Sequence, residues 1–300
     1  LTTQLVFEFD HLQGEIGAEY AAKNGVEKEI CTAIFEHYLP RFQGDTLPQT
    51  RLGALLSLAD KWDNMLAAFV LGKEPTSSAD PFAIRRQSLY IIQILVQQKI
   101  QISLSEVLSK SLNDYPVQKA KENSKALEDK ILQFFKARLV TIFESEGFDK
   151  KLTRAVIFSN SDNVFDLFTR ATAVKLIAEK DGESFAALLA AFKRMAHIIN
   201  ESGQAHKTPL DTALFKEEHE KSLHAFAVRL HTMVKSHTGD LTEHYKKIFT
   251  EFASGKNVVD EFFTHVMVNH EDTHIRQNRL ALLSYTLSAV QNLIRLEELS

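Results

Sequence analysis

Two acidic residues in a predicted helix are the first candidates for chemistry in this chain. Asp60 and Asp63 belong to the segment Ala59-Asp60-Lys61-Trp62-Asp63. Apolar residues recur around them at three- and four-residue spacing from Leu52 to Leu66, so their carboxylates lie one helical turn apart. A carboxylate pair of this kind can hold a metal ion or hydrogen-bond to nearby cations and helix ends.

A pair of arginines follows in a second predicted helix. We expect Asp80 at the N-cap of this helix and Pro81 at its first position. Arg85 and Arg86 come one turn later, ahead of the apolar run from Leu89 to Val96. Hydrogen bonds from these arginines to the carboxylate pair would fix the packing of the two helices, which is the structural alternative to metal binding.

The segment His270-Glu271-Asp272-Thr273-His274 matches the H-E-x-x-H pattern of zinc proteases. In such enzymes both histidines lie on one face within a helix, and a third ligand completes the site. Here the segment follows the apolar run from Val258 to Val268, and Asp272 or Thr273 is placed to cap the next helix. Leu280 occupies the position of a third histidine. We therefore predict a helix junction and neither catalytic residues nor a metal site.

The helix expected from Ser184 to Asn200 separates apolar from polar side chains clearly. Its apolar residues form one continuous stripe that must face a core. From the remaining arc project Lys193, Arg194, His197 and Asn200. Such side chains offer charge for phosphates, planar donors for base edges and a guanidinium plane for stacking. The stripe consists of Phe185, Leu188, Leu189, Phe192, Met195, Ala196 and Ile199.

A second polar cluster is expected at the start of the last helix. Arg276, Asn278 and Arg279 fall within one helical turn there. Charged residues are common on protein surfaces, so an ordinary solvated helix face is the alternative for both clusters. The many phenylalanines, including the adjacent pair Phe262 and Phe263, are expected in the core.

The chain as a whole has an all-helical pattern. It has 300 residues, 44% of them hydrophobic, with only 11 glycines and 6 prolines, and no sheet is evident. The single cysteine, Cys31, excludes an internal disulfide and fits a cytoplasmic, reducing compartment. No apolar run approaches the roughly 20 residues that a membrane span needs. We expect an all-α protein with no membrane partner.

The net charge of −4 argues against a protein that coats DNA or RNA without sequence preference, because such binding needs many phosphate contacts. It leaves room for a protein that reads a few bases of a folded RNA, for which a local basic face suffices.

Two helical domains are predicted, 1–117 and 118–300. The segment Asn113-Asp114-Tyr115-Pro116 interrupts the helical spacing and a polar stretch follows it. Helices in the second domain are expected at about 126–146, 162–180, 183–201, 209–237, 240–253, 257–268 and 273–298.

Several separated segments give the chain a resemblance to the beta subunit of the bacterial type of glycyl-tRNA synthetase. The opening stretch 6–21, VFEFDHLQGEIGAEYA, resembles the family's EF..LQG.MG..YA, and 37–45, HYLPRFQGD, resembles its YLPRF.GD. The two motifs at 59–63 and 80–86 and the triplet Lys193-Arg194-Met195 add to it. The resemblance extends to the far end through 262–268 and 278–280.

This resemblance implies a truncated HD-like helical domain followed by an anticodon-binding bundle like that of arginyl-tRNA synthetase. HD domains bind metal through histidines and aspartates, of which only Asp60 and Asp63 have counterparts here. A metal-dependent phosphohydrolase is therefore the weaker alternative. We expect Asp60, Asp63, Arg85 and Arg86 to be structural or to contact tRNA.

The implied function is recognition of the tRNA for glycine, with the family match supporting Lys193, Arg194, Asn278 and Arg279 as contacts. Unpaired cytosines need donors to O2 and N3 and an acceptor for the N4 amino group, and Glu201 is a candidate acceptor. His197 departs from the asparagine expected at its position, which leaves its role open.

The resemblance also implies that glycine is activated elsewhere, in an alpha subunit or a fused alpha region. ATP and Mg²⁺ would then belong to the complete enzyme, and this chain, expected to be a piece of a longer polypeptide, would need no cofactor of its own. A helical scaffold without RNA affinity is the other alternative.

Overall fold

The computed structural model describes residues 4–116, 123–159, 161–180, 182–202, 209–236, 239–295 and 298. All regular elements in this part of the chain are helices, which confirms the predicted all-α class. The chain divides into two compact units. Unit 1 comprises residues 1–142 and 162–165, and unit 2 comprises residues 143–161 and 166–300. The predicted boundary between residues 117 and 118 lies outside the described residues. The division between the two compact units falls within the helix Ser124–Ser145.

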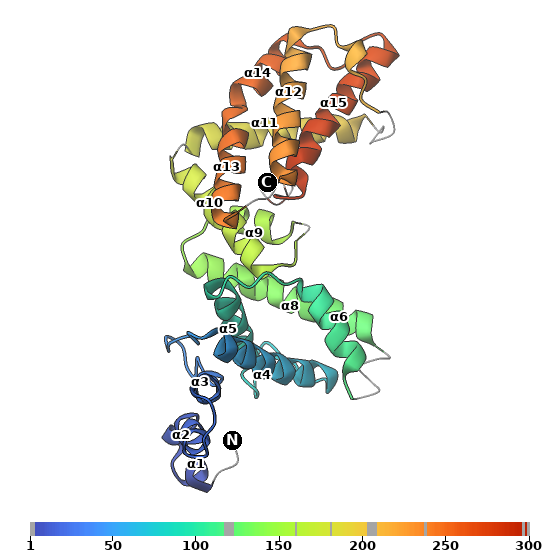
Figure 1. Cartoon of the computed structure of the whole chain (residues 1–300). Coiled ribbons are helices and arrows are strands. Elements are labelled where there is room, and N and C mark those ends of the chain that lie inside the picture. The colour runs from blue at the N-terminus through green and yellow to red at the C-terminus, as the bar shows by residue number, and fades with distance from the viewer. Residues whose placement is uncertain are drawn as a thin grey trace. The chain divides into compact units, whose positions relative to one another are not determined.

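Unit 1 is a stack of short and long helices. Successive helices pack on one another, since α2 contacts α3, α3 contacts α4, and α4 lies beside α5 (Figure 1). The ring of Trp62 on α4 stacks on that of Phe135 on α8, with centroids 5.8 Å apart. The helices are α1 (Gln4–Glu8), η1 (Asp10–Leu12), α2 (Glu15–Lys23), α3 (Lys28–Glu36), α4 (Arg51–Val70), α5 (Ile84–Gln97), α6 (Leu104–Asp114) and α8 (Ser124–Ser145).

The segment 37–45, which resembles a family motif, forms the loop between α3 and α4. The Asp45 carboxylate accepts hydrogen bonds from the backbone N–H and the Nε of Arg41, both at 2.9 Å, and from the backbone N–H of Thr46. The hydrogen bond from the Arg41 side chain is the main cause that lowers the Asp45 pKa to about 2. The motif thus supplies the residues that close a loop.

The start of α5 differs from its prediction. The helix begins at Ile84 after Ala83, whose φ of 53° is left-handed, so Pro81 does not take the first helical position. Asp80 nevertheless caps the helix, because its carboxylate accepts from the backbone N–H of Ile84 at 2.8 Å and of Arg85 at 3.0 Å.

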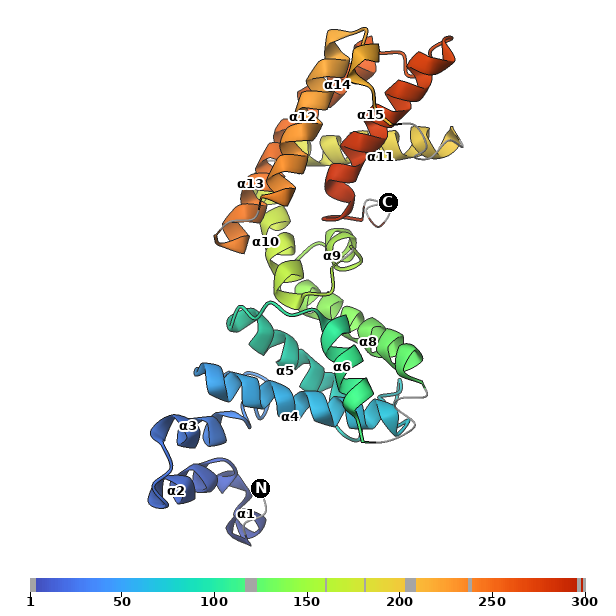
Figure 2. The ribbon, with the colours of Figure 1, turned by 45° about the vertical axis from the view of Figure 1, so that its right-hand side comes forward.

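Unit 2 is a bundle in which α12 and α15 lie side by side and α11 runs across them (Figures 1 and 2). Two short elements in it were not predicted, α9 and the 3₁₀ turn η2, and the last helix ends at Gln291 rather than near residue 298. No described helix in either unit combines the length and the apolar character needed to cross a membrane. The elements are α9 (Lys150–Ile157), α10 (Val164–Lys180), α11 (Gly182–Glu201), η2 (Thr212–Leu214), α12 (Glu218–Lys235), α13 (Leu241–Ser254), α14 (Lys256–His265) and α15 (Thr273–Gln291).

A capping box fixes the start of α12 and explains why no single helix runs from residue 209 to 237. The side chain of Glu217 caps the first turn, and the Glu220 carboxylate accepts from the backbone N–H groups of Lys216 and Glu217, both at 2.7 Å. These bonds satisfy amides that a helix start leaves without partners. The helix therefore begins at Glu218.

Candidate nucleic-acid interface

The two faces of α11 lie as the spacing predicted. Lys193 is half-buried, whereas Arg194, His197 and Asn200 are exposed. Each buried apolar side chain of the stripe contributes about 1.5–3 kcal/mol to stability, which fixes the helix orientation and leaves the polar arc outside. The buried members of the stripe are Phe185, Leu188, Phe192, Met195 and Ile199.

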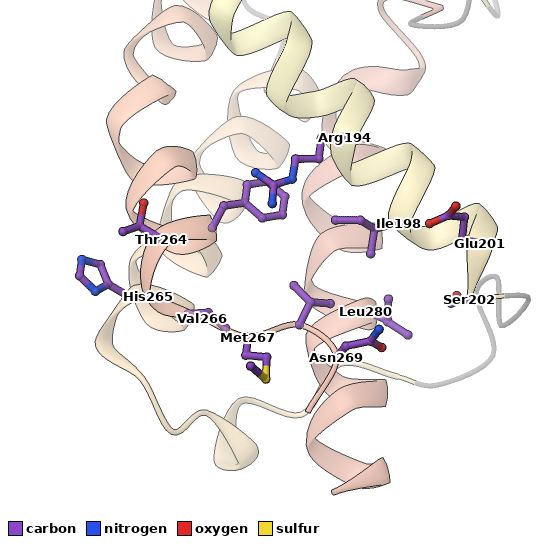
Figure 3. Close-up of a pocket in the computed structure, with 12 residues that line it drawn as sticks. Arg194, Ile198, Glu201, Ser202, Thr264, His265, Val266, Met267, Asn269 and Leu280 are labelled. Carbon is purple, nitrogen blue, oxygen red and sulfur yellow. The ribbon is translucent and has the colours of Figure 1, made fainter. Parts of the chain in front are cut away.

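Arg194 lies at a groove formed by the end of α11, the end of α14 and the segment that follows α14 (Figure 3). Its guanidinium carbon is 4.3 Å from the centroid of the Phe263 ring, a cation–π contact. The groove has a volume of about 730 Å³. Its lining residues are Arg194, Ile198, Glu201, Ser202, Phe263, Thr264, His265, Val266, Met267, Val268, Asn269 and Leu280.

Phe263 is a residue that the sequence analysis placed wrongly. It was expected in the core beside Phe262, but only Phe262 is fully buried, and Phe263 is half-buried against the groove. Phe263 thus lies on the side of α14 that faces the groove, next to the buried Phe262. Met267, which is 70% exposed, adds a second apolar side chain to the groove.

The last turn of α11 adds a polar pair. His197 Nε2 lies 3.2 Å from a carboxylate oxygen of Glu201, one turn further along, and both side chains are largely exposed. Glu201 also lines the groove, about two helical turns from Arg194, so the groove contains both a donor and an acceptor.

The start of α15 does not present the surface that was predicted. Asn278 is 2% exposed and Arg279 is 3% exposed. Arg279 donates from Nε to Glu220 at 3.0 Å and from Nη1 to the carbonyl of Met267 at 2.8 Å. Asn278 accepts from the N–H of Asp211 at 2.8 Å and donates to its carbonyl at 2.9 Å. The expectation that these two side chains would be exposed for tRNA is therefore wrong, and we remove both from the interface.

Arg276, the third member of that cluster, is half-buried. Its contact with tRNA stays a prediction.

The His-Glu-Asp-Thr-His segment forms the predicted helix junction. Asp272 is the N-cap of α15 and accepts from the backbone N–H groups of His274 at 2.8 Å and Ile275 at 3.4 Å. The hydrogen bond from His274, followed by that from Ile275, lowers the Asp272 pKa. His270 Nδ1 accepts from the N–H of Asp272 at 3.0 Å. The segment thus acts as a cap and does not bring its two histidines to one face.

In unit 1, Asp60 and Asp63 are exposed on α4. Within the described ranges neither pairs with Arg85 or Arg86, and neither belongs to a cluster able to hold a metal ion. Arg85 donates instead to the carbonyl of Thr76, and Arg86 is exposed. The predicted packing role for this pair through the arginines is therefore wrong, because Arg85 bonds to a backbone carbonyl and Arg86 is exposed. A contact with tRNA stays a prediction.

The residue between these carboxylates was missed. Lys61 is 5% exposed, and its ammonium donates to the Ser57 hydroxyl at 2.7 Å and to the His37 carbonyl at 3.2 Å. Burial lowers the Lys61 pKa to about 8. The polar neighbours of Lys61 in the sequence gave no sign of its burial.

Comparison with protein families matches both parts of the chain. Residues 1–158 match the model described as glycyl-tRNA synthetase beta subunit. Residues 188–299 match the model described as DALR anticodon binding domain, a range that includes the groove.

Individual relatives match nearly the whole chain. The chain is 36% identical to the glycine–tRNA ligase beta subunit of Desulforamulus reducens. The match covers 97% of the chain and 41% of the length of that protein. It is 35% identical to the beta subunit of Buchnera aphidicola subsp. Schizaphis graminum over 94% of the chain and 40% of the relative. For Clostridioides difficile the identity is 36% with the same two coverages. The chain spans about two fifths of the length of these relatives.

Proposed function

Because the chain belongs to the glycyl-tRNA synthetase beta subunit family, we propose that it binds the tRNA for glycine and that unit 2 holds the anticodon arm. The observation that supports this most directly is the exposed Arg194, stacked on Phe263 at a groove inside the range matched as an anticodon-binding domain. Planar cationic and aromatic side chains are the usual partners of unpaired bases.

The groove contains the chemistry that an unpaired cytosine requires. The Arg194 guanidinium can donate to O2 and N3 or stack on the base, and the Glu201 carboxylate can accept from the N4 amino group. Lys193 adds positive charge on the same helix for the phosphates, and the exposed Asn200 adds an amide directly before Glu201.

We assign catalysis to the remainder of the enzyme. In this proposal the alpha subunit, or a fused alpha region, activates glycine with ATP and Mg²⁺ in the cytoplasm. The contribution of this chain is positional, since binding energy from the anticodon arm holds the distant acceptor end of the tRNA for reaction.

Binding of purified tRNAs tests the proposal. The protein is titrated with the tRNA for glycine and with a non-cognate tRNA at two salt concentrations. We expect tighter binding of the cognate tRNA, and Arg194→Ala should weaken that binding by about 1–3 kcal/mol while reducing the discrimination between the two tRNAs.

Arg229→Ala is the matched control. Arg229 is also an exposed arginine of unit 2 that faces a phenylalanine, but it forms an ion pair with Glu251 at 2.9 Å and does not line the groove. Equal losses of tRNA affinity for Arg194→Ala and Arg229→Ala would mean that binding depends only on the net charge of the protein. Equal binding of the two tRNAs by the unmodified protein would contradict the proposal itself.

A further inference from the structure

Three side chains on two helices of unit 2 form a cluster that the tRNA function does not use. His219 lies in the first turn of α12, and Glu261 and His265 lie one turn apart near the end of α14. One ligand atom from each of the three lies within 4.8 Å of the others. The two imidazoles stack with centroids 4.5 Å apart and an interplanar angle of 13°, and His265 Nε2 is 3.1 Å from a Glu261 carboxylate oxygen.

The donor set has the chemistry of a transition-metal site. Neutral imidazole and carboxylate together bind Zn²⁺ and its neighbours in the first transition row, whereas Mg²⁺ and Ca²⁺ prefer oxygen alone. Three protein ligands also leave a fourth tetrahedral position for water.

To accept one ion, the two imidazole rings must turn out of their parallel stack, because each ring nitrogen binds a metal in the plane of its own ring. Bonds of about 2.1 Å at tetrahedral angles place ligand atoms about 3.4 Å apart. The side chains of His265 and Glu261 are 51% and 58% exposed, so they have rotamer freedom to close the remaining distance. The helices that present the ligands pack directly on each other, which holds the backbones in place.

We propose that His219, Glu261 and His265 bind one divalent transition-metal ion of the Zn²⁺ type, which links the start of α12 to the end of α14. His265 belongs to the lining of the groove, but its ring points away from Ile198 and Leu280, so the metal site lies at the edge of the groove (Figure 3). It adjoins the groove through the chain, since Val266 and Met267 follow His265 directly and form one wall. A bound ion would therefore stiffen that wall without occupying the groove.

Metal binding to the full chain tests this proposal. After dialysis against a chelator, the protein is titrated with Zn²⁺ by calorimetry, and Co²⁺ serves as the spectroscopic probe of tetrahedral coordination. We expect one ion per chain, no competition from excess Mg²⁺, and a higher Tm with Zn²⁺ because the ion binds only the folded state. His219→Ala and Glu261→Gln should each weaken the affinity by at least about tenfold.

His274→Ala is the matched control, because His274 is also an exposed histidine of unit 2 but lies outside the cluster. It should bind Zn²⁺ as the unmodified protein does. Failure of the unmodified protein to bind one ion would overturn the proposal, as would an equal loss for His274→Ala. Because Glu261 is exposed, Glu261→Gln should keep the helical circular dichroism of the parent, so its loss of affinity reports on the site.

Discussion

The last turns of α11 and the first turns of α15 contain the same kinds of polar side chain but use them in opposite ways. On α11, Arg194 is exposed and its guanidinium stacks on Phe263 at the groove. On α15, Arg279 is buried and bonded to Glu220 and to a backbone carbonyl. The comparison shows that a basic residue near a helix end stays exposed or becomes part of the core according to whether the fold supplies an internal acceptor.

Removing the buried arginine should have the largest effect. Arg279→Ala leaves the Glu220 carboxylate, which is 0% exposed, without its cation, so the free energy of unfolding should fall by about 3–5 kcal/mol. Urea denaturation followed by circular dichroism measures this change. Arg194→Ala, which removes only a partly exposed cation–π contact, should cost about 1 kcal/mol or less. Similar losses for the two variants would contradict the division into structural and binding arginines.

Gly255 at the start of α14 tests whether close packing of α14 on α12 is needed to hold the groove wall in place. A Cβ at Gly255 would overlap the Phe226 ring, so Gly255→Ala should destabilise unit 2 by about 1–3 kcal/mol and displace the helix that presents Phe263. Thermal unfolding and tRNA binding measured on one sample check both effects. Gly182→Ala at the start of α11 meets no atom within 4 Å and should leave stability unchanged or slightly raised. A neutral Gly255→Ala would mean that the α12–α14 contact is loosely packed.

Lys61 is a third basic residue for this comparison. It is buried like Arg279, but its described hydrogen bonds go to neutral acceptors. Its pKa of about 8 in the folded state is below the ordinary value, so the unfolded chain binds more protons above that pH and stability should rise with pH. Between about pH 7 and about pH 9.5 the rise should be about 2 kcal/mol. Fluorescence of Trp62, the single tryptophan, monitors unfolding of unit 1.

In the variant Lys61→Met this pH-dependent rise should be absent. A rise of the same size in Lys61→Met would assign the effect to other groups and remove Lys61 from the comparison.

The smallest effect is expected for the exposed pair on α11. His197→Ala removes a contact with Glu201 between two largely exposed side chains, so stability should change by about 0.5 kcal/mol or less. A change in cognate tRNA affinity without a change in stability would place His197 in the interface. No change in either quantity would restrict the interface to Arg194 and its neighbours in the groove.

The features of the candidate interface that could be predicted from the sequence are those determined by residues close to them in the chain. The α11 stripe needs no knowledge of the remaining chain, because its spacing alone decides which arc is buried, and Arg194 follows from it. The burial of Arg279 depends on Glu220, which is far away in the sequence and reaches it only in the folded bundle. Nothing beside Arg279 in the sequence distinguishes it from an exposed arginine.

One error nevertheless had a local signal. The pair Glu217 and Glu220 has the spacing of a capping box, with glutamate where serine or threonine is usual, and marks the true start of α12. The burial of Lys61 had no such signal. One acceptor lies on the preceding turn of α4, but the other lies at the end of α3 and is distant in the sequence.

The position of Glu220 has a consequence for how the bundle opens. First turns of helices usually fray, and their amide protons then exchange quickly with solvent. Here the amides of Lys216 and Glu217 donate to a carboxylate that Arg279 also holds from α15. Because these bonds depend on the position of Glu220, exchange at the two amides should slow in step with exchange in α15, as expected if the beginning of α12 opens in the same cooperative unit as the last helix.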